Sequence, residues 1–220
     1  MEETHMMPMV NSPYNPVLLY VTDPMCAWCY GFTHVVRRLR ALWHGRLTVE
    51  VVAAGLNPYA RDPLSREQKE QLALSWHRVQ ERTSLPFNYS LFVQEDFVYD
   101  TEPACRALHV VRRLRPALTL EILRALHSAF YADGLNLADP QVLAHVVRPF
   151  GIQENLFYTL FEADEIIDAT EKEFEFVEML GVKNLPSVYL EGGMGPELLA
   201  SGFCQLDELE GRLLQHLEMV

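Results

Sequence analysis

Two cysteines at CxxC spacing are the residues of this sequence best suited to chemistry. Cys26 and Cys29 stand in Met-Cys-Ala-Trp-Cys-Tyr, and such a pair can close a redox-active disulfide, supply two zinc ligands or pack in a core. A zinc site needs two further ligands, but Cys105 and Cys204 are isolated along the chain, and His34 is too near Cys29 to complete a tetrahedral set. We therefore favour thiol–disulfide chemistry and expect no metal site.

The residues around this pair predict a strand before it and a helix after it. The apolar run 17–21 ends at a Thr-Asp-Pro turn signal and predicts a buried strand. Apolar residues then recur at helical spacing from Phe32 to Trp43, and the β-branched run 47–55 predicts a second strand. A strand, a helix and a strand in this order predict a βαβ unit with parallel strands and a right-handed crossover.

This placement gives the two thiols different roles. Cys26 would lie at the helix N-terminus, where free N–H groups and the helix dipole stabilise a thiolate. Cys29 would lie about one turn further in, more buried, and would resolve a mixed disulfide.

The rest of the chain predicts a helical block followed by a hairpin and a last helix. The block covers residues 58–181, and its clearest helices are 102–115, 119–132, 139–149, 153–162 and 165–180. Strands at 187–191 and 198–203, around a turn at 192–196, form the hairpin, and 206–217 is the terminal helix. The hairpin and last helix are too small to bury themselves, so they should join the first core. Residues 1–15 are expected to form a loose arm.

Bulk composition restricts the function classes. The chain has 220 residues, 49% of them hydrophobic, and a formal net charge of −12. Such an acidic protein repels phosphate backbones and anionic lipid, so we expect no nucleic-acid partner and no membrane. The N-terminus has no basic region before an apolar run of five residues, too short for a signal or a membrane span. We expect a cytoplasmic protein, in which a CxxC is more often catalytic or metal-binding than structural.

Three segments carry a resemblance to a known family. The Asp-Pro-Met-Cys-Ala-Trp-Cys-Tyr-Gly-Phe segment (23–32), the long helical insert and the Gly-Val-Lys-Asn-Leu-Pro-Ser segment (181–187) resemble the DsbA-like thioredoxin family, and in particular its cytosolic FrnE-type predicted protein-disulfide isomerases. The resemblance implies an α/β class: a thioredoxin-like fold (βαβ…ββα) with a large all-helical insertion domain. The thioredoxin-like domain would be residues 15–57 and 182–220, and the insertion domain 58–181.

The resemblance also implies site residues. Cys26 would be the nucleophile and Cys29 the resolving thiol, and a cis-proline at Pro186 would let the backbone of Leu185 meet a bound peptide strand. Local sequence alone favours a trans bond, since cis is about 5–6% of X–Pro bonds, so this expectation depends on the fold. The sequence departs from strongly oxidising members, which carry a histidine between the cysteines, and it lacks an export signal. Reduction, isomerisation and detoxification therefore all stay open.

We expect a thiol–disulfide oxidoreductase that acts on protein or peptide thiols. Its redox group would be the Cys26–Cys29 disulfide, with no separate cofactor and with glutathione as a candidate co-substrate. One alternative is a glutathione-dependent transferase or isomerase on small electrophiles, although such relatives usually have serine in place of the first cysteine. Another is a non-catalytic redox-sensing module. A monomer and a dimer are both compatible with the sequence.

Asp23 and Trp28 have two readings each, and the two remaining cysteines have one. Asp23 would tune a thiol pKa or form an Asx-type turn before proline, and the turn is favoured. Trp28 would line an apolar substrate groove or simply pack. Cys105 is expected to be a buried inert thiol, and Cys204 to be partly exposed at a turn. The remaining groups are expected to be solvent-facing or core histidines (His77, His109, His127, His145) and a solvated acidic helix face (Glu162, Asp164, Glu165, Asp168, Glu171, Glu173, Glu175, Glu178).

Overall fold

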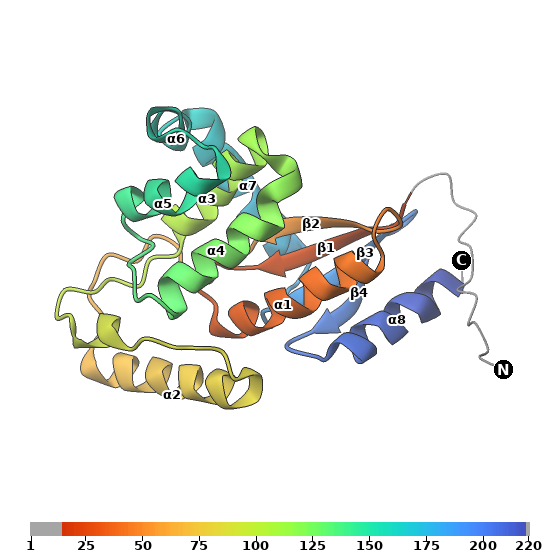
Figure 1. The fold of residues 1–220 in the computed structure, drawn as a ribbon, viewed down its shortest axis with the longest axis horizontal. Helices are drawn as coiled ribbons and strands as arrows, with labels where there is room; N and C mark the ends of the chain where they lie inside the picture. The colour runs from red at the N-terminus through yellow and green to blue at the C-terminus, as the bar shows by residue number, and fades with distance from the viewer. Residues whose placement is uncertain (1–14, 219–220) are drawn as a thin grey trace.

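A four-stranded mixed sheet forms the centre of the molecule. The computed structural model describes residues 15–218, and the expected N-terminal arm lies outside them, apart from Asn15. The strands are β1 (Val17–Thr22), β2 (Thr48–Ala53), β3 (Ser187–Gly192) and β4 (Gly195–Ser201). They lie in the order β2-β1-β3-β4, with β1 and β2 parallel and the other two pairs antiparallel. Figure 1 shows the sheet between its covering helices.

Helices cover both faces of the sheet. Helices α1 (Ala27–Leu42) and α8 (Leu206–Glu218) contact each other and share the larger hydrophobic core with Leu18 and Tyr20 of β1. Because alternate residues of a strand point to opposite faces, the next residues along β1 join a second cluster under α7 (Asp164–Met179). This cluster comprises Leu19, Val21, Val52, Val177 and Tyr189.

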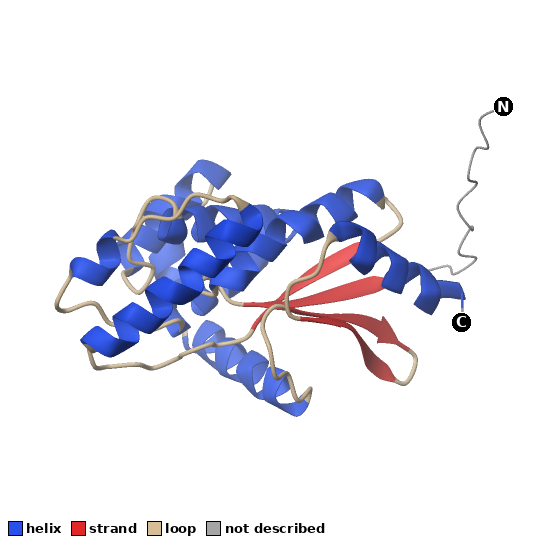
Figure 2. Cartoon of the chain, turned by 90° about the horizontal axis from the view of Figure 1, so that it is seen from below, coloured by secondary structure: helices blue, strands red, loops and turns tan. Residues whose placement is uncertain are grey.

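The segment between β2 and β3 is helical. It contains α2 (Arg66–Thr83), α3 (Glu102–Leu114), α4 (Thr119–Tyr131), α5 (Pro140–Val147), α6 (Glu154–Phe161) and α7. Figure 2 shows most of these helices gathered at one end of the sheet, and in Figure 1 α2 lies below the others. The predicted fold class is confirmed, and the predicted helices match α3 to α7 within a few residues. The division of the chain into two domains stays a prediction.

Helix α2 was missed because most of its surface is polar. Only Trp76 and Val79 are buried, which leaves a weak apolar period. The signal that could have found it is its start, where Ser65 and Gln68 form a capping box. Helix α2 packs closely on α1 at Gly31, where an added Cβ would lie 2.8 Å from Cγ2 of Thr83.

An ion-pair network attaches the inserted helices α3 and α7 to the edge of the sheet. At the free edge of β2, Glu173 of α7 accepts from the backbone N–H of Ala53 and pairs with Arg112 and His109 of α3, at 2.7 and 3.0 Å. Arg112 also donates to the carbonyl of Val51. The expected solvated acidic face is therefore wrong at Glu173, whose side chain is only 12% exposed because it satisfies the edge of a strand.

The hairpin is tighter than predicted. Strand β4 begins at Gly195, so the turn consists of Gly193 and Met194 rather than residues 192–196. Pro196 is tolerated in β4 because this strand lies at the sheet edge. Among the described helices, none is both long and apolar enough to cross a membrane.

Candidate active site

The two CxxC cysteines lie where the sequence predicts, directly after β1 and at the start of α1. Cys26 is the N-cap residue of α1, and its carbonyl accepts from the N–H of Tyr30 at 3.0 Å. Cys26 is 6% exposed and Cys29 fully buried, and both are free thiols. Burial, together with the hydrogen bond and charge of Cys26, raises the pKa of Cys29 well above its usual range. Cys29 therefore stays a thiol until something close to it takes its proton.

Asp23 is a buried carboxyl group in the turn that leads to Cys26. Its Oδ1 accepts from the N–H of Met25 at 2.8 Å, which is the contact of an Asx turn, and its Oδ2 accepts from the N–H of Leu56 at 2.7 Å. The thiol of Cys105 lies 3.4 Å from the same Oδ2. Burial raises the pKa of Asp23, while these hydrogen bonds oppose the rise. The turn reading of Asp23 is confirmed, and its role in tuning a thiol stays a prediction.

A buried histidine connects α4 to the redox turn. Nε2 of His127 lies 3.1 Å from the carbonyl oxygen of Asp23, and Nδ1 lies 3.3 Å from the hydroxyl of Thr33. Since a carbonyl only accepts, Nε2 carries the proton and Nδ1 accepts from Thr33. Thr33 in turn contacts the hydroxyl of Tyr20, which donates to the carbonyl of Cys29. Burial is the main cause that lowers the pKa of His127 to about 3, so the imidazole ring in this hydrogen-bond network is neutral.

Tyrosines of the insertion pack over the same turn. The hydroxyl of Tyr99 donates to the carbonyl of Met25. Tyr30 of α1 stacks on Tyr131 of α4, with ring centroids 5.1 Å apart and planes 8° apart. Tyr131 also packs edge-on against Trp76 of α2. The inserted helices therefore fix the conformation of the segment that carries Cys26.

Leu185 and Pro186 lie at the same end of the sheet as the cysteines. Ser187, the next residue, pairs with Val21 of β1, and the Leu185–Pro186 peptide bond is cis. The carbonyl of Pro186 accepts from the N–H of Gly202 at 2.7 Å. Within residues 15–218, no hydrogen bond joins the N–H or carbonyl of Leu185 to another residue. A backbone in this state can pair with an added peptide strand.

Trp28 is half-buried beside the cysteines. Its ring centroid lies 5.8 Å from that of Phe203, and the guanidinium of Arg82 lies 5.6 Å from the Phe203 centroid. The contact with Phe203 fits a packing role, and the surface that Trp28 keeps exposed leaves room for a substrate role. Its contact with substrate stays a prediction.

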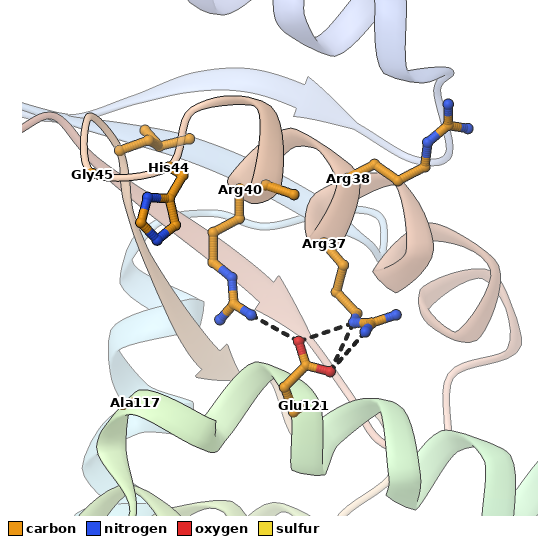
Figure 3. A pocket seen from close by; sticks show the side chains of 9 residues that line it. Arg37, Arg38, Arg40, His44, Gly45, Ala117 and Glu121 are labelled. Carbon is orange, nitrogen blue, oxygen red and sulfur yellow. Dashed lines mark hydrogen bonds and ion pairs between the residues drawn. The ribbon is translucent and has the colours of Figure 1, made fainter.

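A basic cavity lies at the opposite end of α1. It has a volume of about 610 Å³ and shares no lining residue with the CxxC turn or Pro186. Figure 3 shows Arg37 and Arg40 reaching across it to Glu121 of α4, with Arg37 in a two-pronged contact. The two arginines hold the pKa of Glu121 below its usual range, although partial burial works the other way. This contact fixes α4, and with it His127, against α1.

Cys204 differs from the expectation. It was expected to be partly exposed after the last strand, but it is 7% exposed because α8 and the sheet close over it. Burial raises its pKa to about 11. Among the described residues, no group of three or more histidine, cysteine, aspartate or glutamate side chains could hold a metal ion.

Sequence reasoning missed three partners of the redox turn: His127, Tyr99 and Cys105. His127 was one of four single histidines, and Cys105 was expected to be inert. One local signal was available, since His127 and Tyr131 are four residues apart and therefore share a helix face. Tyr99, Cys105 and His127 each contact a residue of the redox turn that is 74 to 104 positions away in the chain.

A family model and several solved structures match this chain. The model of the DSBA-like thioredoxin domain matches residues 17–213. Among curated proteins, none matches. A candidate protein disulfide isomerase from Nitrosomonas europaea is 32% identical, with a TM-score of 0.87, over 94% of this chain and 99% of that one.

The cytosolic disulfide reductase DsbM from Pseudomonas aeruginosa is also similar in fold. It is 21% identical, with a TM-score of 0.76, over 93% of this chain and 100% of that one. Its structure with glutathione is 20% identical, with a TM-score of 0.73, over 92% of this chain and 99% of that one.

Proposed function

This chain belongs to the DSBA-like thioredoxin domain family, and on this premise we propose that it exchanges disulfides with protein or peptide substrates through Cys26 and Cys29. Its family and its relatives are thiol–disulfide oxidoreductases and isomerases. The observation that carries the proposal is the asymmetry of the pair. Cys26 caps a helix N-terminus, and Cys29 is fully buried behind it.

The reaction runs in two thiol–disulfide exchanges. The thiolate of Cys26 attacks one sulfur of a substrate disulfide, forms a mixed disulfide, and releases the other substrate sulfur as a thiolate that takes a proton. Cys29 then loses its proton and attacks the Cys26 sulfur, which releases the second substrate thiol and leaves the Cys26–Cys29 disulfide. The substrate gains two electrons and the cysteine pair loses them. The reverse sequence oxidises a dithiol.

Leu185, Pro186 and Trp28 form the substrate site in this proposal. The unpaired backbone of Leu185 supports it, because an extended substrate can add to this edge by main-chain hydrogen bonds. Trp28 and Phe203 supply apolar surface next to Cys26.

Glutathione is the proposed reductant of the Cys26–Cys29 disulfide. Two glutathione molecules would reduce the pair and leave as one glutathione disulfide, so no separate cofactor is needed. The structure of the fold relative DsbM with glutathione supports testing this thiol first. We propose the cytoplasm as the compartment, where glutathione keeps thiols reduced.

Reduction of insulin and refolding of scrambled ribonuclease, each with glutathione, test the proposal. Wild type should accelerate at least one reaction, Cys26→Ser should be inactive, and Cys29→Ser should lose most turnover. Cys204→Ala is the matched control, since this thiol is buried and its pKa is raised to about 11. Equal activity of wild type and Cys26→Ser would rule out the proposed function.

The same variants separate the alternatives. A transferase acting on small electrophiles uses one activated thiol, so Cys29→Ser would keep full activity with such substrates. A redox-sensing module would show no turnover with any variant, although oxidation would change its partner binding.

A further inference from the structure

Cys105 is a third thiol at the redox turn, and it comes from α3 rather than from the CxxC. Its sulfur is fully buried and lies 3.4 Å from Oδ2 of Asp23. Burial, followed by the charge of Asp23, raises the pKa of Cys105 well above its usual range. The sulfur therefore keeps its proton, and the contact is an S–H group that donates to a carboxylate.

The other donors to Asp23 are mostly backbone groups. The N–H groups of Met25 and Leu56 come from the segments after β1 and β2, and side-chain substitution leaves such groups in place. Thr101, directly before α3, also opposes the raised pKa of Asp23, but less than Cys105 does. Cys105 is thus the side chain through which α3 acts most directly on this carboxyl group.

The titratable groups that face Asp23 come from several elements. Cys26 and Cys29 of α1, Tyr99 of the loop before α3, Cys105 of α3 and Tyr131 of α4 surround it, and His127 of α4 bonds to its carbonyl. The tyrosines have pKa values raised by burial and stay neutral, as does His127. Burial raises the pKa of Asp23, and its carboxyl group is the one in this cluster that Cys105 contacts directly.

We propose that Cys105 is a positioning residue for the exchange reaction: its S–H group stabilises the Asp23 carboxylate and so sets the negative charge beside the CxxC pair. A carboxylate near a thiol disfavours the thiolate, and a neutral carboxyl group does not. Loss of the donor therefore makes Asp23 hold its proton to higher pH, and a stronger donor does the opposite. The proposal rests on the exchange function proposed above.

Carbon-13 NMR titration of the Asp23 carboxyl group in the reduced full-length protein tests this inference, with Asp23→Asn to assign the signal. Cys105→Ala should move the titration midpoint upward. Cys105→Ser should move it downward, because a hydroxyl donates more strongly than a thiol. If Cys105→Ala does not fold, the test is the difference in the Asp23 midpoint between Cys105→Ser and wild type. An unchanged midpoint, or an upward shift in both variants, would overturn the proposal.

Alkylation of Cys26 supplies a second readout. Between the midpoints of wild type and Cys105→Ala, iodoacetamide should modify Cys26 about threefold faster in the variant. Well above both midpoints the two rates should be equal, which a general loosening of the site would not produce. The carboxyl titration needs no turnover, so failure of this inference is distinct from failure of the proposed function, which Cys26→Ser decides.

Discussion

His127 should make the stability of this protein sensitive to acid. Its neutral ring is fully buried between the carbonyl of Asp23 and the hydroxyl of Thr33. Burial lowers its pKa from 6.5 to about 3. Because the folded pKa lies below the unfolded one, only the unfolded chain takes up a proton between these values. The stability that the neutral His127 ring contributes is therefore nearly complete above about pH 6.5 and is lost as the pH falls toward 3.

The size of this effect follows from the two pKa values. The linkage cost is about 0.2 kcal/mol at pH 7 and about 2 kcal/mol at pH 5. His127→Gln keeps an amide donor and acceptor but cannot titrate. Between pH 7 and pH 5, wild type should therefore lose about 2 kcal/mol more unfolding free energy than this variant.

Urea unfolding followed by tryptophan fluorescence at both pH values measures this double difference. His77→Gln is the control, because the His77 side chain is 61% exposed and its ion pair is with Glu81 in its own helix. That variant should keep the wild-type acid dependence. If His127→Gln kept it as well, the reasoning about a neutral buried ring would be refuted.

Three further predictions concern packing, an ion pair and a thiol. Gly31→Ala should lower the unfolding free energy by about 1–3 kcal/mol, because the new Cβ meets Thr83; Thr83→Ser, which removes the contacted methyl group, should restore part of it, and no rescue would contradict the cause. Glu173→Gln should cost about 2 kcal/mol in urea unfolding at pH 7, since it removes the carboxylate that pairs with Arg112; a loss below about 0.5 kcal/mol would mean that the pair is dispensable. Cys204→Ala should keep insulin reduction within about twofold of wild type, given a buried thiol whose pKa is raised to about 11; a larger loss would assign it a redox role.

The sequence predicted the core of the fold because its signals are local. A five-residue apolar run, a CxxC and a helical apolar period lie close together, so β1 could be placed within one residue and α1 directly after the first cysteine. Hydrophobic periodicity also located α3 to α7. It failed at α2, whose polar surface carries little period and whose stability comes from contacts such as the one at Gly31.

The site residues likewise fall into those with a local sequence signal and those without one. Cys26, Cys29 and Pro186 could be named from motifs and from the order of the elements. The partners of Asp23 could not, because Cys105 and His127 reach it only after the inserted helices fold back over α1. A single cysteine or histidine in a helical pattern gives no sign of a contact made across so many residues.

The most direct test of the central claim is the intact mass of Cys29→Ser protein after incubation with glutathione disulfide, followed by mapping of the modified peptide. Without the resolving thiol, the first exchange should stop at a mixed disulfide. We expect one added glutathione, on Cys26. No adduct, or an adduct on Cys105 or Cys204 with Cys26 unmodified, would contradict it.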